Sequence, residues 1–209
     1  MESKSSVRVG LILFILVLAV ILVVLLVNLM PLMANADVGR QSAPTARTGV
    51  TSQVALTDAE ARARVRALEW TEDVKLVRAE AAWYPQQNWR EVETPPVAWA
   101  FYYYSPGARA VSSIVIDDDD LLWTTPFEIP TPPRAIDGFP PQYDIDVAWI
   151  SFRAAGGDEF LRGHPSAQVS FRLQPKDGRP LWTVSAFSEG DYFAIQVDAE
   201  SGAVVLNEQ

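Results

Sequence analysis

The stretch from Asp144 to Leu173, DIDVAWISFRAAGGDEFLRGHPSAQVSFRL, decides how this chain folds. Its first part places four apolar residues at the helical spacing i, i+3, i+4 and i+7, namely Ile145, Ala148, Trp149 and Phe152. Asp144 can cap this helix, and the pair Gly156-Gly157 is expected to end it. The last part, Ala167 to Leu173, alternates apolar and polar residues, as a half-buried strand does. The stretch therefore predicts a helix followed by a strand.

Two more strands are expected after it, Leu181 to Phe187 (LWTVSAF) and Tyr192 to Asp198 (YFAIQVD). A turn at Ala199 to Gly202 then leads into a short strand over Ala203 to Leu206. Large apolar residues alternate with small or polar ones along these strands, which is typical of a sheet with one face on a helix and the other in solvent. The second half of the chain thus predicts one helix packed on an antiparallel sheet.

The first half repeats this order. A helix is expected from Leu56 to about Trp70, with Thr57 as its N-cap and Glu60 completing a capping box. Its buried face is expected to carry three residues at helical spacing, Ala61, Val65 and Leu68. Strands are expected over three further segments, Val74 to Tyr84, Val97 to Tyr104 and Ala110 to Asp117. Trp99, Ser105 and Gly107 each precede a matching residue, Trp182, Ser188 or Gly190, by 83 positions, which indicates a weak internal repeat.

Six of the chain's 15 prolines lie between residues 124 and 141. Proline fixes φ and removes an amide donor, so this segment is expected to be an extended linker between the two units. The predicted organisation is a cytoplasmic N-terminus (1–8), a transmembrane helix (9–30), a tether (31–55), a first unit (56–123), a linker (124–141) and a second unit (142–209).

The second half resembles PepSY-type domains, clearest over residues 144–206. The last strand of such domains closes with an Asp-Ala-x-x-Gly-x-Val turn, matched here by Asp198, Ala199, Gly202 and Val204. The first half resembles them less, because it ends in four aspartates, Asp117 to Asp120, without that turn. The resemblance implies two cystatin-like α+β units, each with one helix on a curved antiparallel sheet. It also implies a non-catalytic extracytoplasmic module, as found in protease propeptides, proposed inhibitors and sensor or accessory domains.

The N-terminal region predicts membrane attachment. Nineteen residues from Val9 to Val27 carry no charged or hydrogen-bonding side chain, which is enough for a helix to cross a bilayer, and the predicted span runs from Val9 to Met30. Lys4 and Arg8 favour a cytoplasmic N-terminus. The alternative is a signal peptide cleaved after Ala36, in the sequence Ala-Asn-Ala. Both readings place residues 37–209 outside the cytoplasm, on a single-pass or formerly anchored protein of the cell membrane.

Composition argues against several classes of function. The chain has no cysteine and one histidine, His164, so thiolate chemistry, Cys/His zinc sites and lipid attachment to cysteine are not expected. Its net charge is −9, which argues against a nucleic-acid partner. No cofactor motif is present. The run Asp117 to Asp120 is read as a solvated hairpin end, with a calcium site as the open alternative.

The sequence therefore predicts a binding protein and not an enzyme. The expected partner is a protein, contacted through a sheet edge or through the loop from Gln86 to Glu93. The candidate contact residues are Trp89 in that loop and the aromatic pair Tyr102 and Tyr104, while most other tryptophans are expected between helix and sheet. The alternatives are a structural subunit of a membrane complex or a regulator of a secreted protease. A hydrolase using the carboxylates of Asp158 and Glu159 is the third choice.

Overall fold

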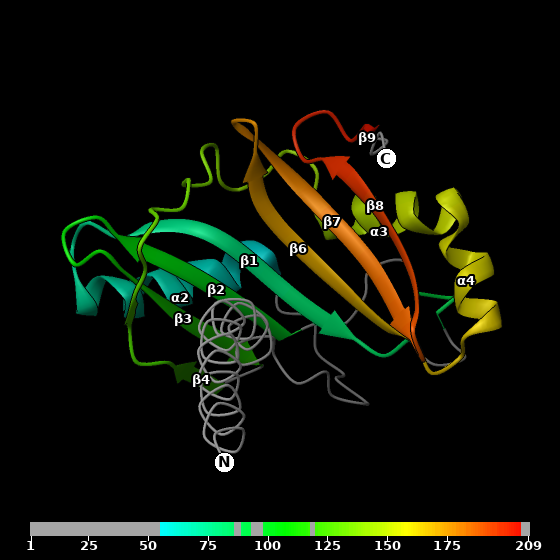
Figure 1. Ribbon diagram of the computed structural model, residues 1–209, viewed down its shortest axis with the longest axis horizontal. Coiled ribbons are helices and arrows are strands. Elements are labelled where there is room, and N and C mark those ends of the chain that lie inside the picture. Colours follow the sequence, from blue (N-terminus) through cyan, green and yellow to red (C-terminus); the bar gives the residue numbers. More distant parts are fainter. Residues whose placement is uncertain (1–54, 86–88, 93–97, 118–119, 206–209) are drawn as a thin grey trace, which may run out of the picture. The chain divides into compact units, whose positions relative to one another are not determined.

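The computed structural model describes residues 55–85, 89–92, 98–117 and 120–205. They form an α+β structure in which helices pack against one antiparallel sheet (Figure 1). The predicted transmembrane helix at 9–30, the N-terminus before it and all but the end of the tether lie outside the described residues. No helix within the described ranges combines the length and the hydropathy that a membrane crossing requires.

Each half of the chain supplies helix and strands in the order that the repeat predicts. The elements of the first half and the connector are α2 (Leu56–Trp70), β1 (Lys75–Trp83), β2 (Ala98–Ser105), β3 (Ala110–Asp117), β4 (Asp120–Trp123) and β5 (Phe127–Glu128). Those of the second half are α3 (Ile145–Phe152), the π-helical turn η1 (Arg153–Gly157), α4 (Asp158–Gly163), β6 (Gln168–Lys176), β7 (Arg179–Ser188), β8 (Asp191–Asp198) and β9 (Val204–Val205). The strands predicted from period-two alternation are thus confirmed to within a few residues.

The two halves share one sheet. The strand order is β4-β3-β2-β1-β6-β7-β8-β9, with β5 also paired to β3, and every pair is antiparallel. β1 of the first half pairs with β6 of the second, with Ala81 opposite Phe171. The expectation of two units with separate sheets is therefore corrected. The physical reason is that the first strand of each half has an open edge, and pairing the two edges satisfies both rows of amides and carbonyls.

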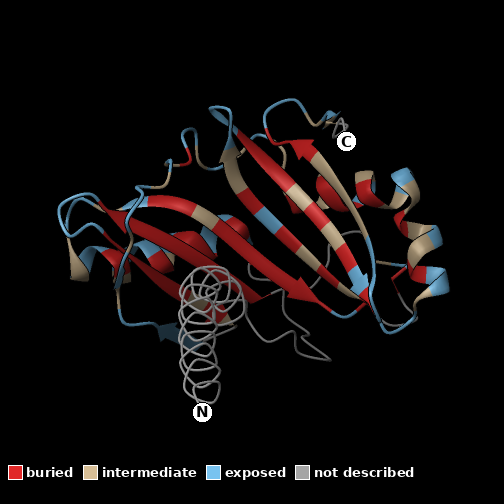
Figure 2. Ribbon diagram, in the orientation of Figure 1, coloured by how far each residue is buried: buried red, intermediate tan, exposed pale blue. Residues whose placement is uncertain are grey.

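Helices α2 and α3 lie on one face of this sheet, behind the strands in Figure 1, with α2 against the first half and α3 against the second, while α4 is drawn beside β8. Between helices and sheet lies a core rich in aromatic rings, and the burial of β2 extends over its whole length (Figure 2). Trp99 and Trp182, which the repeat makes equivalent, lie 6.2 Å apart between ring centroids. The indole of Trp182 donates to the carbonyl of Tyr143 at 2.9 Å. The prediction that most tryptophans fill this interface is confirmed.

Helix α2 buries a different face from the one expected. Its N-cap is Ala55, with no side-chain cap, so the predicted cap at Thr57 is wrong. The buried residues of α2 are Leu56, Ala59, Glu60, Ala63 and Ala67, whereas Ala61, Val65 and Leu68 are exposed. Small alanines let the helix approach a sheet whose core side chains are large. Glu60 is tolerated in this face because its carboxylate accepts a hydrogen bond from the Tyr103 hydroxyl at 3.0 Å.

The start of the second helix is as predicted, but its end is not. The amide of Ile145 donates to the Asp144 carboxylate at 2.6 Å, which confirms the cap. The helical path then continues through η1 into α4, with Gly156 at φ +120°. A Cβ on Gly157 would overlap the ring of Phe152. The two glycines therefore bend the helix around that ring instead of ending it.

The proline-rich segment contains no helix, and its regular structure is the two-residue strand β5, with bends at residues 130–131 and 138–140. It does more than link the halves, because part of it packs on the sheet. Phe127 and Glu128 pair with β3, and the buried Ile136 donates its amide to the carbonyl of Leu76 at 2.8 Å. Ile129 packs on a second apolar cluster, which lies among the strands of the first half (Val77, Ala100, Tyr102, Tyr104 and Val111).

Candidate functional site

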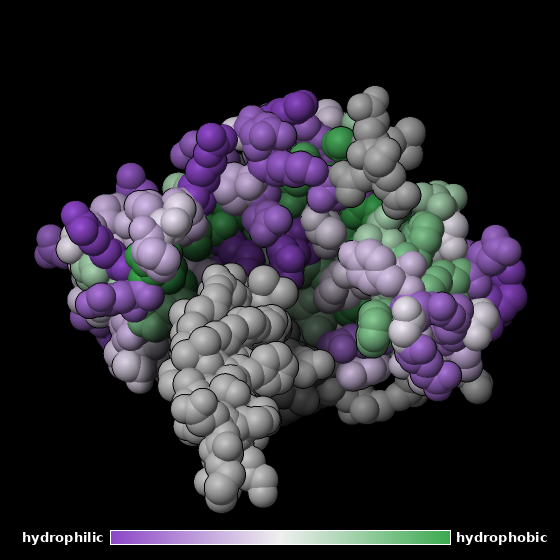
Figure 3. Space-filling model, in the orientation of Figure 1, coloured by the Kyte–Doolittle hydropathy of each residue, from purple (hydrophilic) through white to green (hydrophobic). Residues whose placement is uncertain are grey.

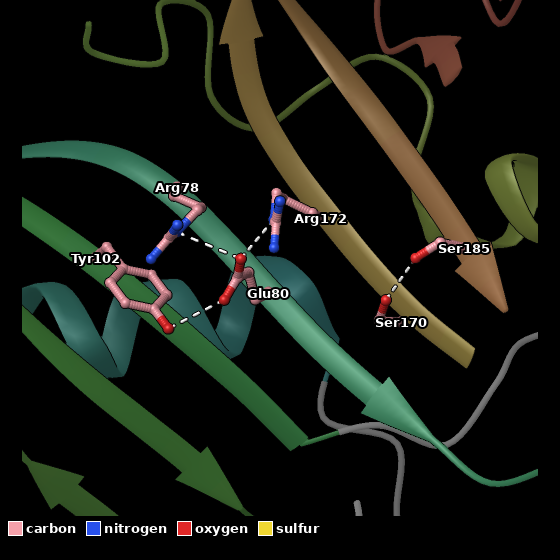
Figure 4. Close-up of polar contacts among 6 residues, drawn as sticks. All are labelled: Arg78, Glu80, Tyr102, Ser170, Arg172 and Ser185. Carbon is pink, nitrogen blue, oxygen red and sulfur yellow. Dashed lines mark hydrogen bonds and ion pairs between the residues drawn. The ribbon is translucent and has the colours of Figure 1, made fainter. Parts of the chain in front are cut away.

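A polar cluster lies at the seam where the two halves of the sheet meet (Figure 4). Its centre is Glu80 of β1, which is only 8% exposed. The carboxylate accepts from the Tyr102 hydroxyl at 3.0 Å and from Nε of Arg172 at 2.5 Å. Arg78 approaches the same carboxylate at 3.4 Å, and its guanidinium lies over the Tyr102 ring, 3.8 Å from the centroid. Three neighbouring strands therefore meet at one carboxylate.

Strand register produces this cluster. Glu80 lies opposite Ala100 of β2 and opposite Arg172 of β6. Residues directly opposite each other in antiparallel strands point to the same face, so these side chains share the face that carries no helix. Next to them, the hydroxyls of Ser170 and Ser185 lie 2.7 Å apart. In the view of Figure 3, hydrophilic residues gather over the middle of this face.

The cluster is built to hold the sheet together. Both carboxylate oxygens of Glu80 are engaged by donors, so the charge is compensated inside the cluster. A catalytic base would need an oxygen free to meet a substrate proton. The arrangement instead ties the first half, through β1 and β2, to the second half, through Arg172.

The single histidine joins the end of α4 to the first residue of β8. Nδ1 of His164 lies 2.9 Å from the Phe160 carbonyl, and Nε2 lies 2.9 Å from the Asp191 carboxylate. Both partners are acceptors, so only the protonated ring, with two N–H donors, satisfies both contacts. Two hydrogen bonds raise the pKa of His164 above its usual value. The bond to the Phe160 carbonyl has the larger effect, and the bond to Asp191 the next largest.

The turn that carries the PepSY resemblance has a defined geometry. The Asp198 carboxylate accepts from the amides of Glu200 and Ser201, at 2.9 Å each. Gly202 takes φ +70°, a conformation that favours glycine. The amide hydrogen bonds hold the pKa of Asp198 below its usual value. This motif therefore forms the turn into β9, a structural role.

The predicted contact residues are not on the surface. Trp89, Tyr102 and Tyr104 are between 2% and 6% exposed, so they present little surface to a partner in this structure, and their contact with one stays a prediction. Trp89 packs into the core between helices and sheet, although it follows a polar loop segment. The two tyrosines belong to β2, an interior strand that is buried on both faces. Residues 86–88 and 93 of the predicted contact loop lie outside the described residues.

The predicted carboxylate sites also have ordinary structural partners. Asp158 forms an ion pair with Arg153 at 3.0 Å. Asp117 and Asp120 face each other at the closed end of the β3–β4 hairpin, in line with the hairpin end expected there, while residues 118–119 are not described. Within the described ranges, no three His, Asp or Glu side chains gather closely enough to hold a metal ion.

Exposed apolar side chains gather instead along one edge of the sheet. Four of them, in β4 and β5, are 38% to 64% exposed, namely Leu121, Leu122, Trp123 and Phe127. The guanidinium of Arg66 on α2 lies 4.4 Å from the centroid of the Trp123 ring. This apolar edge was missed from the sequence. The sequence feature that could have revealed this edge is the run Leu-Leu-Trp directly after four aspartates. Such a short apolar strand has few neighbouring residues that could cover its side chains, so they are expected to stay exposed.

Comparisons with known proteins leave the family of this chain open. No family model matches it, so the PepSY likeness stays a resemblance, and no curated protein matches either. Among solved structures, the chain is similar to the crystal structure of a proposed lipoprotein from Clostridium difficile 630. The two share 12% sequence identity with a TM-score of 0.48, over 74% of this chain and 91% of the other. At those values the similarity carries no conclusion about function.

Proposed function

We propose that this chain is a membrane-anchored, extracytoplasmic, PepSY-like binding module that acts as an accessory or regulatory protein without catalysis. The apolar segment Val9 to Val27 supports the anchor, and the location of residues 37–209 outside the cytoplasm follows from that prediction. The α+β class, with helices on an antiparallel sheet, agrees with the class that the PepSY resemblance implies, although the two halves share one sheet.

The observation that carries the proposal is the apolar edge formed by β4 and β5. Large apolar side chains that cluster on a surface strand are typical of protein interaction sites, because burying them against a partner removes them from water. In this edge Leu122 is 64% exposed. Charged residues are the usual protection of a sheet edge, and β4 carries one, Asp120, followed by Leu, Leu and Trp in succession.

The polar clusters favour binding over catalysis. The carboxylate of Glu80 is occupied by Tyr102 and Arg172, and that of Asp158 by Arg153. The hydroxyl of Ser166 lies 3.4 Å from that of Ser188, while both nitrogens of His164 have other partners. These groups hold the structure together, and none of the described contacts pairs a nucleophile with a base.

Purification of the tagged full-length chain from its native membrane in mild detergent tests the proposal, with mass spectrometry of the intact chain and of its companions. An intact N-terminus with stoichiometric integral membrane proteins supports a subunit of a membrane complex. A chain that begins at Asp37, or that elutes only with a secreted peptidase, supports the regulator of a protease. A chain that elutes alone in every mild detergent contradicts a binding function, and turnover abolished by Asp158→Ala or Glu159→Ala would make the protein a hydrolase.

A further inference from the structure

Strand β4 forms one end of the sheet and has a paired neighbour, β3, on one side. All four of its residues are exposed. Leu122 and its cross-strand partner Val115 lie on the face without helices, while Leu121 and Trp123 lie on the face that carries α2. A partner that covers this edge would therefore bury apolar surface on both sides of the strand.

The backbone of β4 also offers hydrogen bonds at this edge. The amide of Thr124, which follows β4, donates to the carbonyl of Ser113 in β3 at 2.9 Å. In an antiparallel pair, alternate residues turn their amide and carbonyl toward the neighbour and away from it. Counting back from Thr124, Leu122 faces β3, and Leu121 and Trp123 present their backbone groups outward. Their spacing matches the ladder of an added strand.

The acidic residues in and beside β4 indicate the charge of the partner segment. Asp120 begins β4 and lies opposite Asp117, and Glu128 follows along the same edge in β5. The chain as a whole carries a net charge of −9. A second copy of the chain would bring the same acidic residues and the same net charge, and the two copies would repel each other. A segment with basic residues next to Asp120 is complementary.

We propose that β4 accepts an extended segment of a partner protein as an antiparallel added strand, with alternating apolar side chains and with Lys or Arg at its C-terminal end beside Asp120. This inference rests on the proposed binding function and specifies the surface and the chemistry of the partner. In this antiparallel arrangement, the C-terminal end of the added strand lies beside Asp120, which begins β4, so the basic residues belong at that end.

The probe is a fluorescein-labelled peptide, Thr-Val-Thr-Val-Thr-Lys-Arg, titrated with the full-length chain in detergent and followed by fluorescence anisotropy. We expect saturable binding that is weakened about tenfold or more when Glu-Glu replaces Lys-Arg. N-methylation of one alternate set of peptide amides should abolish binding, and methylation of the other set should leave it, because only one set faces β4. Equal binding of the acidic peptide, or an equal effect of both methylations, overturns the inference.

Two variants separate the contributions of charge and apolar contact. The Asp120→Lys chain should no longer bind the basic peptide and should bind the acidic one. The Leu122→Ser chain should bind the basic peptide about tenfold more weakly. The matched control is Val204→Ser on β9, the strand at the opposite end of the sheet, where Val204 is also exposed. It should bind as the unaltered chain does. Circular dichroism checks that each variant is folded, and unchanged peptide binding by folded Leu122→Ser overturns the inference.

Native purification of the Leu122→Ser chain distinguishes this inference from the proposed function. Loss of companion proteins that the unaltered chain retains supports both. Retention of all companions contradicts docking at β4 and leaves the binding function standing. Absence of companions from the unaltered chain as well contradicts the binding function itself.

Discussion

The two halves of this protein repeat one order of elements, yet they treat the helix-free face of the sheet differently. In the first half, that face carries a second apolar cluster around Tyr102 and Tyr104, against which the connector residue Ile129 packs. In the second half, the same face carries polar residues such as Ser170 and Ser185. The first half also ends in the four-residue strand β4, all of whose residues are exposed, whereas the second ends in the two-residue strand β9. A repeated fold thus leaves each half free to use its outer surfaces differently.

The largest expected effect tests whether the halves form one cooperative structure. Trp99→Ala and Trp182→Ala each remove a fully buried indole, so we expect each to lower the free energy of unfolding by about 3–5 kcal/mol. Because both residues lie in one core under one sheet, both variants should shift the same single transition in urea denaturation followed by circular dichroism. Trp123→Ala, at an exposed tryptophan, is the control and should cost less than about 1 kcal/mol. Two separate transitions would show that the halves unfold independently.

The seam between the halves can be weakened at Glu80. Glu80→Leu leaves Arg78, Arg172 and Tyr102 without their shared acceptor, and we expect a loss of about 2 kcal/mol in the same denaturation experiment. The control is Glu69→Leu, which removes an exposed ion pair with Arg66 on α2 and should cost less than about 0.5 kcal/mol. If the two variants are equally stable, the cluster contributes nothing to joining the halves.

The helix of the second half is bent, whereas α2 is a single α-helix. Gly157 permits this bend because it has no Cβ. Gly157→Ala places a methyl group against Phe152, so we expect a loss of about 1–2 kcal/mol in thermal or urea unfolding. Gly163→Ala is the matched control, because a Cβ there meets no atom within 4 Å. That variant should be neutral or slightly stabilising, since alanine restricts the unfolded chain. Equal stability of the two variants would mean that the bend relaxes around the added methyl.

The smallest effect is expected from pH at the histidine contact. The folded-state pKa of His164 is raised, so its contacts contribute stability that is fully present below the unfolded pKa of about 6.5. That stability is lost as the pH rises through the folded value. Asp191→Asn should therefore lower Tm at pH 5.5 and have less effect at pH 8.5. Besides Asp191, Glu189 is the charged group that acts on the ring.

Asp177→Asn, in the turn between β6 and β7, serves as the control for this titration. Asp177 takes φ +52°, which Asn tolerates, so the substitution should change Tm little at either pH. An Asp191→Asn effect that is the same at both pH values would contradict a protonated His164 in the folded protein.

Local signals in the sequence were sufficient for the elements themselves. Alternation located the strands to within a few residues, and Asp144 was identified as a cap because capping involves neighbouring residues only. The face of α2 was predicted wrongly, because its alanines are weak signals beside Val65 and Leu68. Those larger residues lie on the exposed side, since the sheet leaves space only for small ones. Size and spacing within a helix do not reveal the depth available beneath it.

By itself, the sequence determined the α+β class, the repeated order of helix and strands, a proline-rich connector without a helix and an acidic chain without cysteine. Only the tertiary structure decided that β1 pairs with β6, that Trp89 is buried and that Trp123 is exposed. The physical reason is the range of the interactions. Turns, caps and alternation act between near neighbours, whereas strand pairing and burial depend on segments far apart in the chain, and those contacts place the apolar edge of β4 on the surface.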